Sequence, residues 1–140
     1  MRITLAKTAG FCFGVARATK AVETEMADHP AGERIFTLGR LIHNEIYNQR
    51  LAAGGVTVIS AEELPRLAAE ATPEAPVKVF VRAHGMTLEV EKMLSDLSAQ
   101  HTNLRVVDCT CPFVKNIHKI AEEESTPFAD TPDEALGIIF

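Results

Sequence analysis

The chain has 140 residues, of which 46% are hydrophobic and 24% are charged, and its formal net charge at pH 7 is −5. This size and composition are typical of one soluble globular unit, and no stretch approaches the roughly 18 consecutive apolar residues of a membrane-spanning helix. The acidic balance and the lack of a Lys/Arg run argue against a general nucleic-acid-binding protein, and the N-terminus has no signal-peptide pattern, so we expect a cytoplasmic protein with no membrane partner.

The spacing of apolar residues predicts strands that alternate with helices. The expected strands are short β-prone runs at residues 2–6, 34–38, 56–60, 77–81 and 104–108. The expected helices carry an apolar stripe at helical spacing and cover residues 15–29, 44–54, 87–100 and 111–124. Residues 61–76, rich in Ala, Glu and Pro, are expected to form a surface connection with one helical turn. Alternation at these lengths predicts an α/β fold, in which a parallel sheet has flanking helices.

Four side chains with reactive groups stand where an expected strand gives way to a helix. Cys12 follows the first strand and His43 the second, while His84 follows the fourth and Cys111 the fifth. Ligands of open parallel sheets bind outside the carboxyl ends of the strands, where helix N-termini present free N–H groups. We therefore expect the two thiols and the two imidazoles to converge on one edge of the sheet.

These residue types suit a metal ion or an anion. A helix N-terminus stabilises a thiolate, which is the form of cysteine that binds metals, and Pro112 after Cys111 is suited to the first helical position. Histidine can donate to an anionic oxygen and can carry charge near neutral pH. A lone cysteine is nevertheless more often a buried apolar residue, and a lone histidine more often a loop residue without a ligand. On the residues alone, the prediction is a metal or anion site at the sheet edge.

The remaining cysteine, Cys109, is expected to pack into the sheet. A one-residue gap to Cys111 gives poor disulfide geometry, and three cysteines are too few for a disulfide scaffold. Cys12, Cys109, Cys111 and His118 nominally supply four zinc ligands, but the tetrahedron fails if Cys109 points into the sheet. His118 follows Cys111 by two helical turns, and a packing or capping role is as open for it as a role in the site.

Read together, the segments at which the expected strands give way to helices resemble the motifs of a known family. GFCFGVARA (10–18), LIHNE (41–45), VRAHGM (81–86) and DCTCPFVKNIHK (108–119) are similar to successive motifs of the LytB/IspH family, the 4-hydroxy-3-methylbut-2-enyl diphosphate reductases of the non-mevalonate isoprenoid pathway. The likeness runs from residue 2 to about residue 124. It implies an iron–sulfur enzyme built from three similar α/β domains around a central 4Fe-4S cluster, with this chain holding the first domain and the start of the second.

The resemblance implies roles for four residues. Cys12 and Cys111 would be cluster ligands, and His43 and His84 would hold the substrate diphosphate, whereas Cys109 would not be a ligand. The reaction would be the reductive dehydroxylation of an allylic diphosphate to isopentenyl and dimethylallyl diphosphates, with electrons from ferredoxin or flavodoxin.

The resemblance also implies that the chain is incomplete. It assigns residues 1–107 to a first α/β domain, residues 108–125 to the opening helix of a second, and residues 126–140 to a divergent or truncated tail. The family's third cysteine, a further histidine and its proton-donating acid have no match here. No catalytic residue is therefore assigned, and the chain is expected to be a fragment that is inactive alone.

Two alternatives stay open at this point. The chain could be a non-enzymatic α/β module that binds zinc or an anion, or a degenerate remnant that barely folds. In every case the apolar stripe of Phe113, Ile117 and Ile120 in the last helix would need cover from the first domain or from a partner.

Overall fold

The computed structural model of the chain describes residues 3–4, 6–7 and 9–125. Its strands are β1 (Arg34–Leu38), β2 (Thr57–Ile59), β3 (Val77–Val81) and β4 (Leu104–Asp108). Its helices are α1 (Phe13–Ala27), α2 (Glu45–Ala53), α3 (Leu64–Ala69), α4 (Leu88–Gln100) and α5 (Pro112–Ser125), and a short 3₁₀ helix, η1 (Ala61–Glu63), precedes α3.

The strands form one parallel sheet in the order β2-β1-β3-β4. β1 and β3 pair along their full length, from Arg34 opposite Val77 to Leu38 opposite Val81. β3 pairs with β4 in the same way, so β3 is hydrogen-bonded on both sides. This arrangement confirms the predicted α/β class, a parallel sheet with flanking helices.

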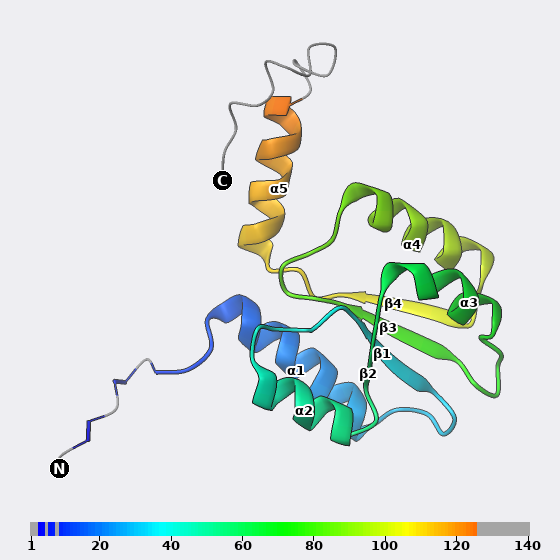
Figure 1. The fold of residues 1–140 in the computed structure, drawn as a ribbon, viewed down its shortest axis with the longest axis horizontal. Coiled ribbons are helices and arrows are strands. Elements are labelled where there is room, and N and C mark those ends of the chain that lie inside the picture. The colour runs from blue at the N-terminus through cyan, green and yellow to red at the C-terminus, as the bar shows by residue number, and fades with distance from the viewer. Residues whose placement is uncertain (1–2, 5, 8, 126–140) are drawn as a thin grey trace.

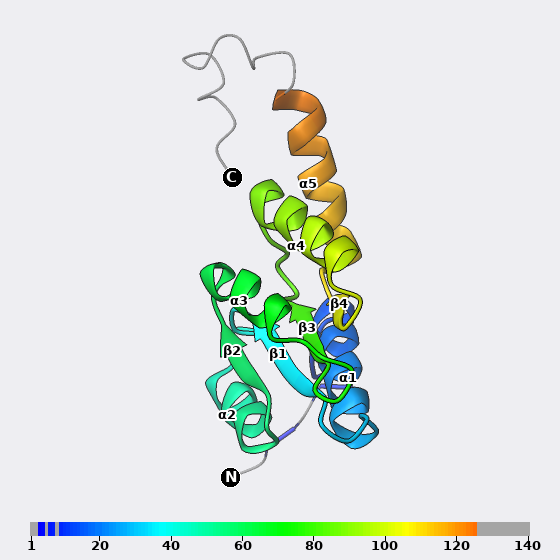
Figure 2. The ribbon, with the colours of Figure 1, turned by 90° about the vertical axis from the view of Figure 1, so that its right-hand side faces the viewer.

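Helices cover both faces of the sheet, with α1 and α2 on one side and α3 and α4 on the other (Figures 1 and 2). Each face has its own apolar core. The α1–α2 core consists of Ala18, Val22, Ile35, Leu41, Ile42, Tyr47, Leu51, Val56, Phe80, Ala83 and Cys109. The α3–α4 core consists of Phe36, Leu38, Ile59, Leu64, Leu67, Ala68, Val77, Val79, Val81, Leu94 and Leu104. Since α2 follows β1 and α4 follows β3, the connections after these neighbouring strands leave the sheet toward opposite faces.

Most expected elements are present, with ends within two residues of the prediction. The strands at 34–38, 77–81 and 104–108 are found as predicted, and all five residues of β3 are buried, as its continuous apolar character indicated. The region 61–76 contains both η1 and α3 instead of a single helical turn.

The expected strand at residues 2–6 is wrong where the structure describes it, because residues 3, 4 and 6 form no strand. The four strands pair with one another, and Ile3 is 74% exposed. A β-prone run that lacks both a pairing strand and a surface to cover gains little from being extended. Residues 2 and 5 of this run, and the tail expected at 126–140, lie outside the described residues.

The last helix, α5, extends away from the two helical layers (Figure 1). Its apolar stripe is open to solvent, since Phe113 is 72% exposed and Ile117 and Ile120 are each 49% exposed. Among the residues that the structure describes, nothing covers the stripe fully. None of the described helices, α5 included, has the length and apolar character that a membrane span requires.

A buried lysine lies between two carboxylates at the opposite end of the sheet from the loops that carry the histidines. Lys78 of β3 is 1% exposed, and its ammonium is 2.9 Å from a carboxylate oxygen of Glu33, whose side chain is also 1% exposed. The same ammonium pairs with Glu25 of α1, whose side chain reaches solvent. A buried charge is tolerated only when it is paired in this way.

We expect Lys78→Met to destabilise the chain strongly, because the substitution leaves the carboxylate of Glu33 buried without its cation. Breaking a buried pair from one side costs about 3–5 kcal/mol. The measurement is the free energy of unfolding from urea denaturation followed by circular dichroism.

Lys92→Met is the matched control, since Lys92 is 82% exposed and its ion pair with Asp96 spans 3.8 Å at the surface. That change should alter stability by less than about 1 kcal/mol. The double variant Lys78→Met/Glu33→Leu should recover most of the loss, because no buried charge is then left unpaired. Equal unfolding midpoints for the two single variants would contradict the structural role of the buried lysine.

Candidate functional site

The two histidines meet at the carboxyl edge of the sheet, between its neighbouring strands β1 and β3. His43 lies in the loop after β1 and His84 in the loop after β3. Their ring centroids are 4.5 Å apart, and the ring planes are inclined by 57°. The two loops lead to opposite faces of the sheet (Figures 1 and 2), and ligands of open α/β sheets usually bind where neighbouring connections diverge in this way.

The electrostatic surroundings of His84 disfavour its charged form. Partial burial is the largest cause of the lowered pKa of His84, and the neighbouring His43 and Arg82 lower it further. Arg82 is held within the same loop, since its Nε donates to the carbonyl of Gly85 over 3.0 Å. The loops therefore collect positive or ionisable groups, and an anion bound beside them would reverse the Coulombic part of this pKa shift.

Cys12 and Cys111 each stand at the start of a helix. The carbonyl of Cys12 accepts the first hydrogen bond of α1 from Ala16, and the carbonyl of Cys111 accepts that of α5 from Lys115, both at 2.9 Å. The thiol of Cys12 is exposed and that of Cys111 is partly exposed. Both side chains thus stand beside the free N–H groups of a helix start.

A glycine brings the two cysteine-bearing segments together. A Cβ built on Gly14, in the first turn of α1, would lie 2.8 Å from Cβ of Cys111 and still closer to its sulfur. Any larger residue at position 14 would therefore push the start of α5 away. Because Gly14 has no Cβ, the side chain of Cys111 can pack directly against the first turn of α1, which Cys12 caps.

Backbone contacts tie the cysteine segments to the histidine loops. The amide of Cys111 donates to the carbonyl of Ala83, next to His84, over 2.9 Å. Arg17 of α1 donates to the carbonyl of Thr110, which precedes Cys111. The structure thus places α1, the loop after β3 and the loop after β4 along one edge.

Asp108 fixes the loop between β4 and α5. Its carboxylate accepts from the amide of Thr110 over 2.8 Å and forms an ion pair with Lys115. Burial raises the pKa of Asp108, but the hydrogen bonds from Lys115 and Thr110 outweigh it, so the pKa is lowered overall. Asp108 is therefore a charged anchor for the turn that presents Cys111.

Cys109 is a core residue, as expected. It is 2% exposed within the α1–α2 core, and burial raises the pKa of its thiol to about 11. The nominal zinc tetrahedron of Cys12, Cys109, Cys111 and His118 is therefore not formed. Among residues 3–4, 6–7 and 9–125, no group of three or more His, Cys, Asp or Glu side chains is arranged to hold a metal ion.

Two residues that position the site, Gly85 and Arg17, were not found from the sequence. Gly85 provides close approach, and Arg17 provides a link between α1 and the loop before Cys111. Gly14, in contrast, flanks Cys12 in the motif GFCFGVARA, where a glycine lets backbone come close to a bulky group. For Gly85 in VRAHGM, the signal available was a small residue directly beside a reactive one. His118, whose role the sequence left open, lies against Gly85.

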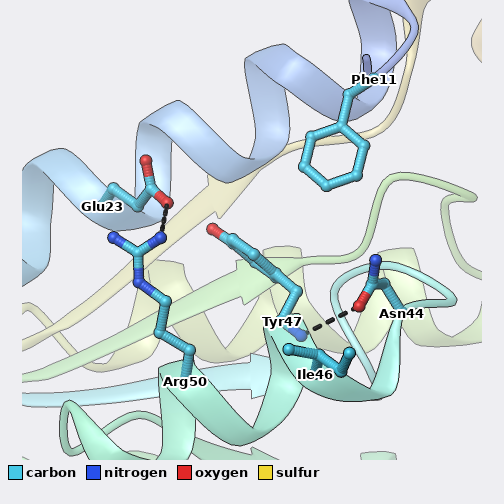
Figure 3. A pocket seen from close by; sticks show the side chains of 6 residues that line it. All are labelled: Phe11, Glu23, Asn44, Ile46, Tyr47 and Arg50. Atoms are coloured by element: carbon cyan, nitrogen blue, oxygen red, sulfur yellow. Dashed lines mark hydrogen bonds and ion pairs between the residues drawn. The ribbon is translucent and has the colours of Figure 1, made fainter. Parts of the chain in front are cut away.

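An open pocket of about 330 Å³ adjoins the site between α1 and α2 (Figure 3). It is lined by Phe11, Glu23, Asn44, Ile46, Tyr47 and Arg50. Phe11 and Tyr47 meet edge to face with centroids 6.1 Å apart, and Asn44 caps α2 by accepting from the amide of Tyr47 over 3.0 Å. Burial, followed by the nearby charge of Glu23, raises the pKa of the Tyr47 phenol to about 12, so this side chain stays neutral.

Comparison with known proteins identifies similar chains. The family model described as LytB protein matches residues 3–129. The 4-hydroxy-3-methylbut-2-enyl diphosphate reductase of Thermoanaerobacter sp. (strain X514) is 40% identical over 123 residues, which are 88% of this chain and 38% of that protein. The reductase of the same name from Geobacter sp. (strain M21) is 41% identical over 115 residues, 82% of this chain and 35% of that protein.

Solved structures give the same picture. The structure of (E)-4-hydroxy-3-methyl-but-2-enyl diphosphate reductase, the terminal enzyme of the non-mevalonate pathway, matches with a TM-score of 0.61 and 31% identity over 89% of this chain and 39% of that one. The corresponding reductase of Plasmodium falciparum has a TM-score of 0.64 at 24% identity and supports the fold alone; the match covers 86% of this chain and 33% of that one. The chain thus spans well under half the length of these relatives. With the family model matching nearly its whole length, the chain belongs to the LytB family.

Proposed function

We propose that this chain is the N-terminal part of an iron–sulfur reductase of the non-mevalonate isoprenoid pathway, acting in the cytoplasm. The reaction is the reductive dehydroxylation of 4-hydroxy-3-methylbut-2-enyl diphosphate to isopentenyl and dimethylallyl diphosphates. The observation that carries the proposal is the pair of imidazoles at the carboxyl ends of β1 and β3, where the two loops leave toward opposite faces of the sheet. Their ring centroids are 4.5 Å apart, and two helix starts that carry cysteines lie along the same edge. The matching relatives bear the name of this enzyme.

The activity belongs to a longer protein. The chain spans 38% of the Thermoanaerobacter reductase, so we assign residues 1–107 to a first α/β domain and residues 108–125 to the opening helix of a second. The 140-residue chain alone would be inactive. The acid that delivers protons would lie outside the described residues, and no catalytic residue is assigned within them.

His43 and His84 would bind the diphosphate of the substrate. Protonated imidazoles donate charge-assisted hydrogen bonds to phosphate oxygens, and two rings at this spacing can reach neighbouring oxygens of one diphosphate. The like-charge neighbours that lower the pKa of His84 in the free chain are the groups that an anion would neutralise. Substrate binding would thus be coupled to protonation of His84.

Cys12 and Cys111 fit two of the ligand positions of a 4Fe-4S cluster. The missing Cβ of Gly14 lets Cys111 lie against the first turn of α1, and both cysteines stand at helix starts with thiols that are at least partly exposed. A third ligand would come from outside the described residues. When bound, the cluster would pass on, one at a time, the two electrons that ferredoxin or flavodoxin donates, and it would offer a Lewis-acidic iron.

We expect Cys12→Ser or Cys111→Ser to abolish the brown colour and the activity of the full-length protein purified without oxygen. Each change removes a thiolate that iron requires. The measurement is the visible absorption spectrum together with the iron and sulfide content per chain.

Cys109→Ser is the matched control, because Cys109 is buried in the core and is not a ligand. It should lower stability but leave the iron content and the spectrum of the folded fraction unchanged. Retention of the full iron content in both Cys12→Ser and Cys111→Ser would reject the ligand assignment.

We expect inorganic pyrophosphate to raise the pKa of His84 in the 140-residue chain and to bind more tightly as the pH falls toward that pKa. The sign follows from linkage: an anion that prefers the protonated ring must increase proton affinity when it binds. The measurement is an NMR titration of ¹⁵N-labelled histidine side chains with and without pyrophosphate.

His43→Gln should raise the pKa of His84 in the free chain, since it removes one like-charged neighbour, but not fully, since burial remains the larger cause. The same variant should weaken pyrophosphate binding. His101→Gln, at the C-terminal end of α4 and the other edge of the sheet, should change neither. Because pyrophosphate ionises identically in both samples, equal affinities for the two variants would rule out an anion site at the histidine pair.

A further inference from the structure

His118 of α5 packs into a gap that only a glycine leaves. Gly85, directly after His84, has φ of +79°, and a Cβ built on it would lie 2.8 Å from Cε1 of His118 and 3.1 Å from Cγ2 of Thr110. Nδ1 of His118 would be 3.5 Å away. The edge of the imidazole therefore fills the space where another residue would carry its side chain.

The loop at this contact is a closed turn. The amide of Gly85 donates to the carbonyl of Arg82 over 3.0 Å, and Nε of Arg82 donates back to the carbonyl of Gly85 over 3.0 Å. Ala83 within the turn donates to Leu41 over 3.2 Å and accepts from Cys111 over 2.9 Å. His84 is thus carried by a turn that two hydrogen bonds close, and His118 packs against this turn at Gly85.

The contact joins two parts of the site. α5 starts at Cys111, and two turns later the same helix presents His118 to the loop of His84. The imidazole pair of His43 and His84 forms only when this loop lies toward the loop after β1. A side chain that fixes Gly85 therefore also fixes the spacing of the pair.

We propose that His118 is a positioning residue, which holds the loop of His84 by packing on Gly85 and so keeps His84 facing His43. The role of the pair in anion binding rests on the function proposed above, whereas the packing role of His118 does not. His118 acts through His84 and does not itself contact the anion, because its Cε1–Nδ1 edge is turned to Gly85. The shape of the ring is what matters, not its charge.

The test uses the ¹⁵N-labelled 140-residue chain and compares His118→Ala with His118→Phe. Alanine removes the ring and is the best helix former, so α5 itself is not weakened. Amide hydrogen exchange at Gly85 and Cys111 should accelerate in His118→Ala. The affinity for inorganic pyrophosphate should fall about fivefold, as expected if the competent loop arrangement drops to about one-fifth of the population.

His118→Phe keeps a planar ring without a titratable group and should restore both the slow exchange and the affinity. His101→Ala, a histidine change at the other edge of the sheet, should behave as wild type. Unchanged exchange in His118→Ala would overturn the proposal, and so would a His118→Phe variant as impaired as His118→Ala, since that would assign the effect to charge.

The two proposals fail in different ways. If the unmodified chain does not bind pyrophosphate, the anion-binding role of His43 and His84 is rejected, while the exchange rates at Gly85 and Cys111 still decide whether His118 holds the loop. If pyrophosphate binds but the exchange rates do not respond to His118→Ala, the positioning role is rejected and the anion site stands.

Discussion

The pairing of β3 with β1 is the constraint on which the rest of the molecule depends. β3 is hydrogen-bonded on both sides and buried along its whole length, so its position in the sheet is fixed. Its placement beside β1, and not beyond β2, puts the loops after β1 and β3 next to each other while their helices go to opposite faces. The closeness of His43 and His84 follows from this one choice of neighbour.

Two glycines also help to fix the positions of the segments that carry the candidate site residues. Gly14 makes room for Cys111, and Gly85 makes room for His118. Both are contacts between segments about 30 to 100 residues apart, and each requires a missing side chain on one partner. The start of α5 is therefore held between α1 and the loop of His84, although most of that helix lies outside the core.

The sequence was sufficient to predict the alternation of strands and helices from residue 34 onward and the loops that carry His43, His84 and Cys111, whereas the strand expected before Cys12 is wrong where the structure describes it. Local patterns contain that information, because a buried parallel strand is a continuous β-branched run and a helix repeats its apolar residues at helical spacing. Local patterns do not reveal the order of the strands in the sheet. The sequence therefore predicted that the two imidazoles lie at the same edge of the sheet, but not that they are direct neighbours.

Three features were out of reach because they depend on distant partners. The run VKVFV predicted β3 but gave no sign that Lys78 is neutralised by carboxylates from α1 and from the segment before β1. The segment 2–6 has strand propensity, yet in the described residues it meets no pairing strand. The contact of His118 with Gly85 joins segments that α4 and β4 separate in the chain, and neither residue type reveals it.

The buried lysine has a consequence for how this chain can change over evolutionary time. Lys78 and its carboxylates lie at the amino end of the strands, whereas the imidazoles and thiols of the site occupy the carboxyl end and are largely open to water. The buried charges that must stay paired and the side chains of the candidate site thus stand at opposite rims of one sheet. A lineage could lose its reacting groups one by one and still produce a compact polypeptide that escapes proteolytic clearance.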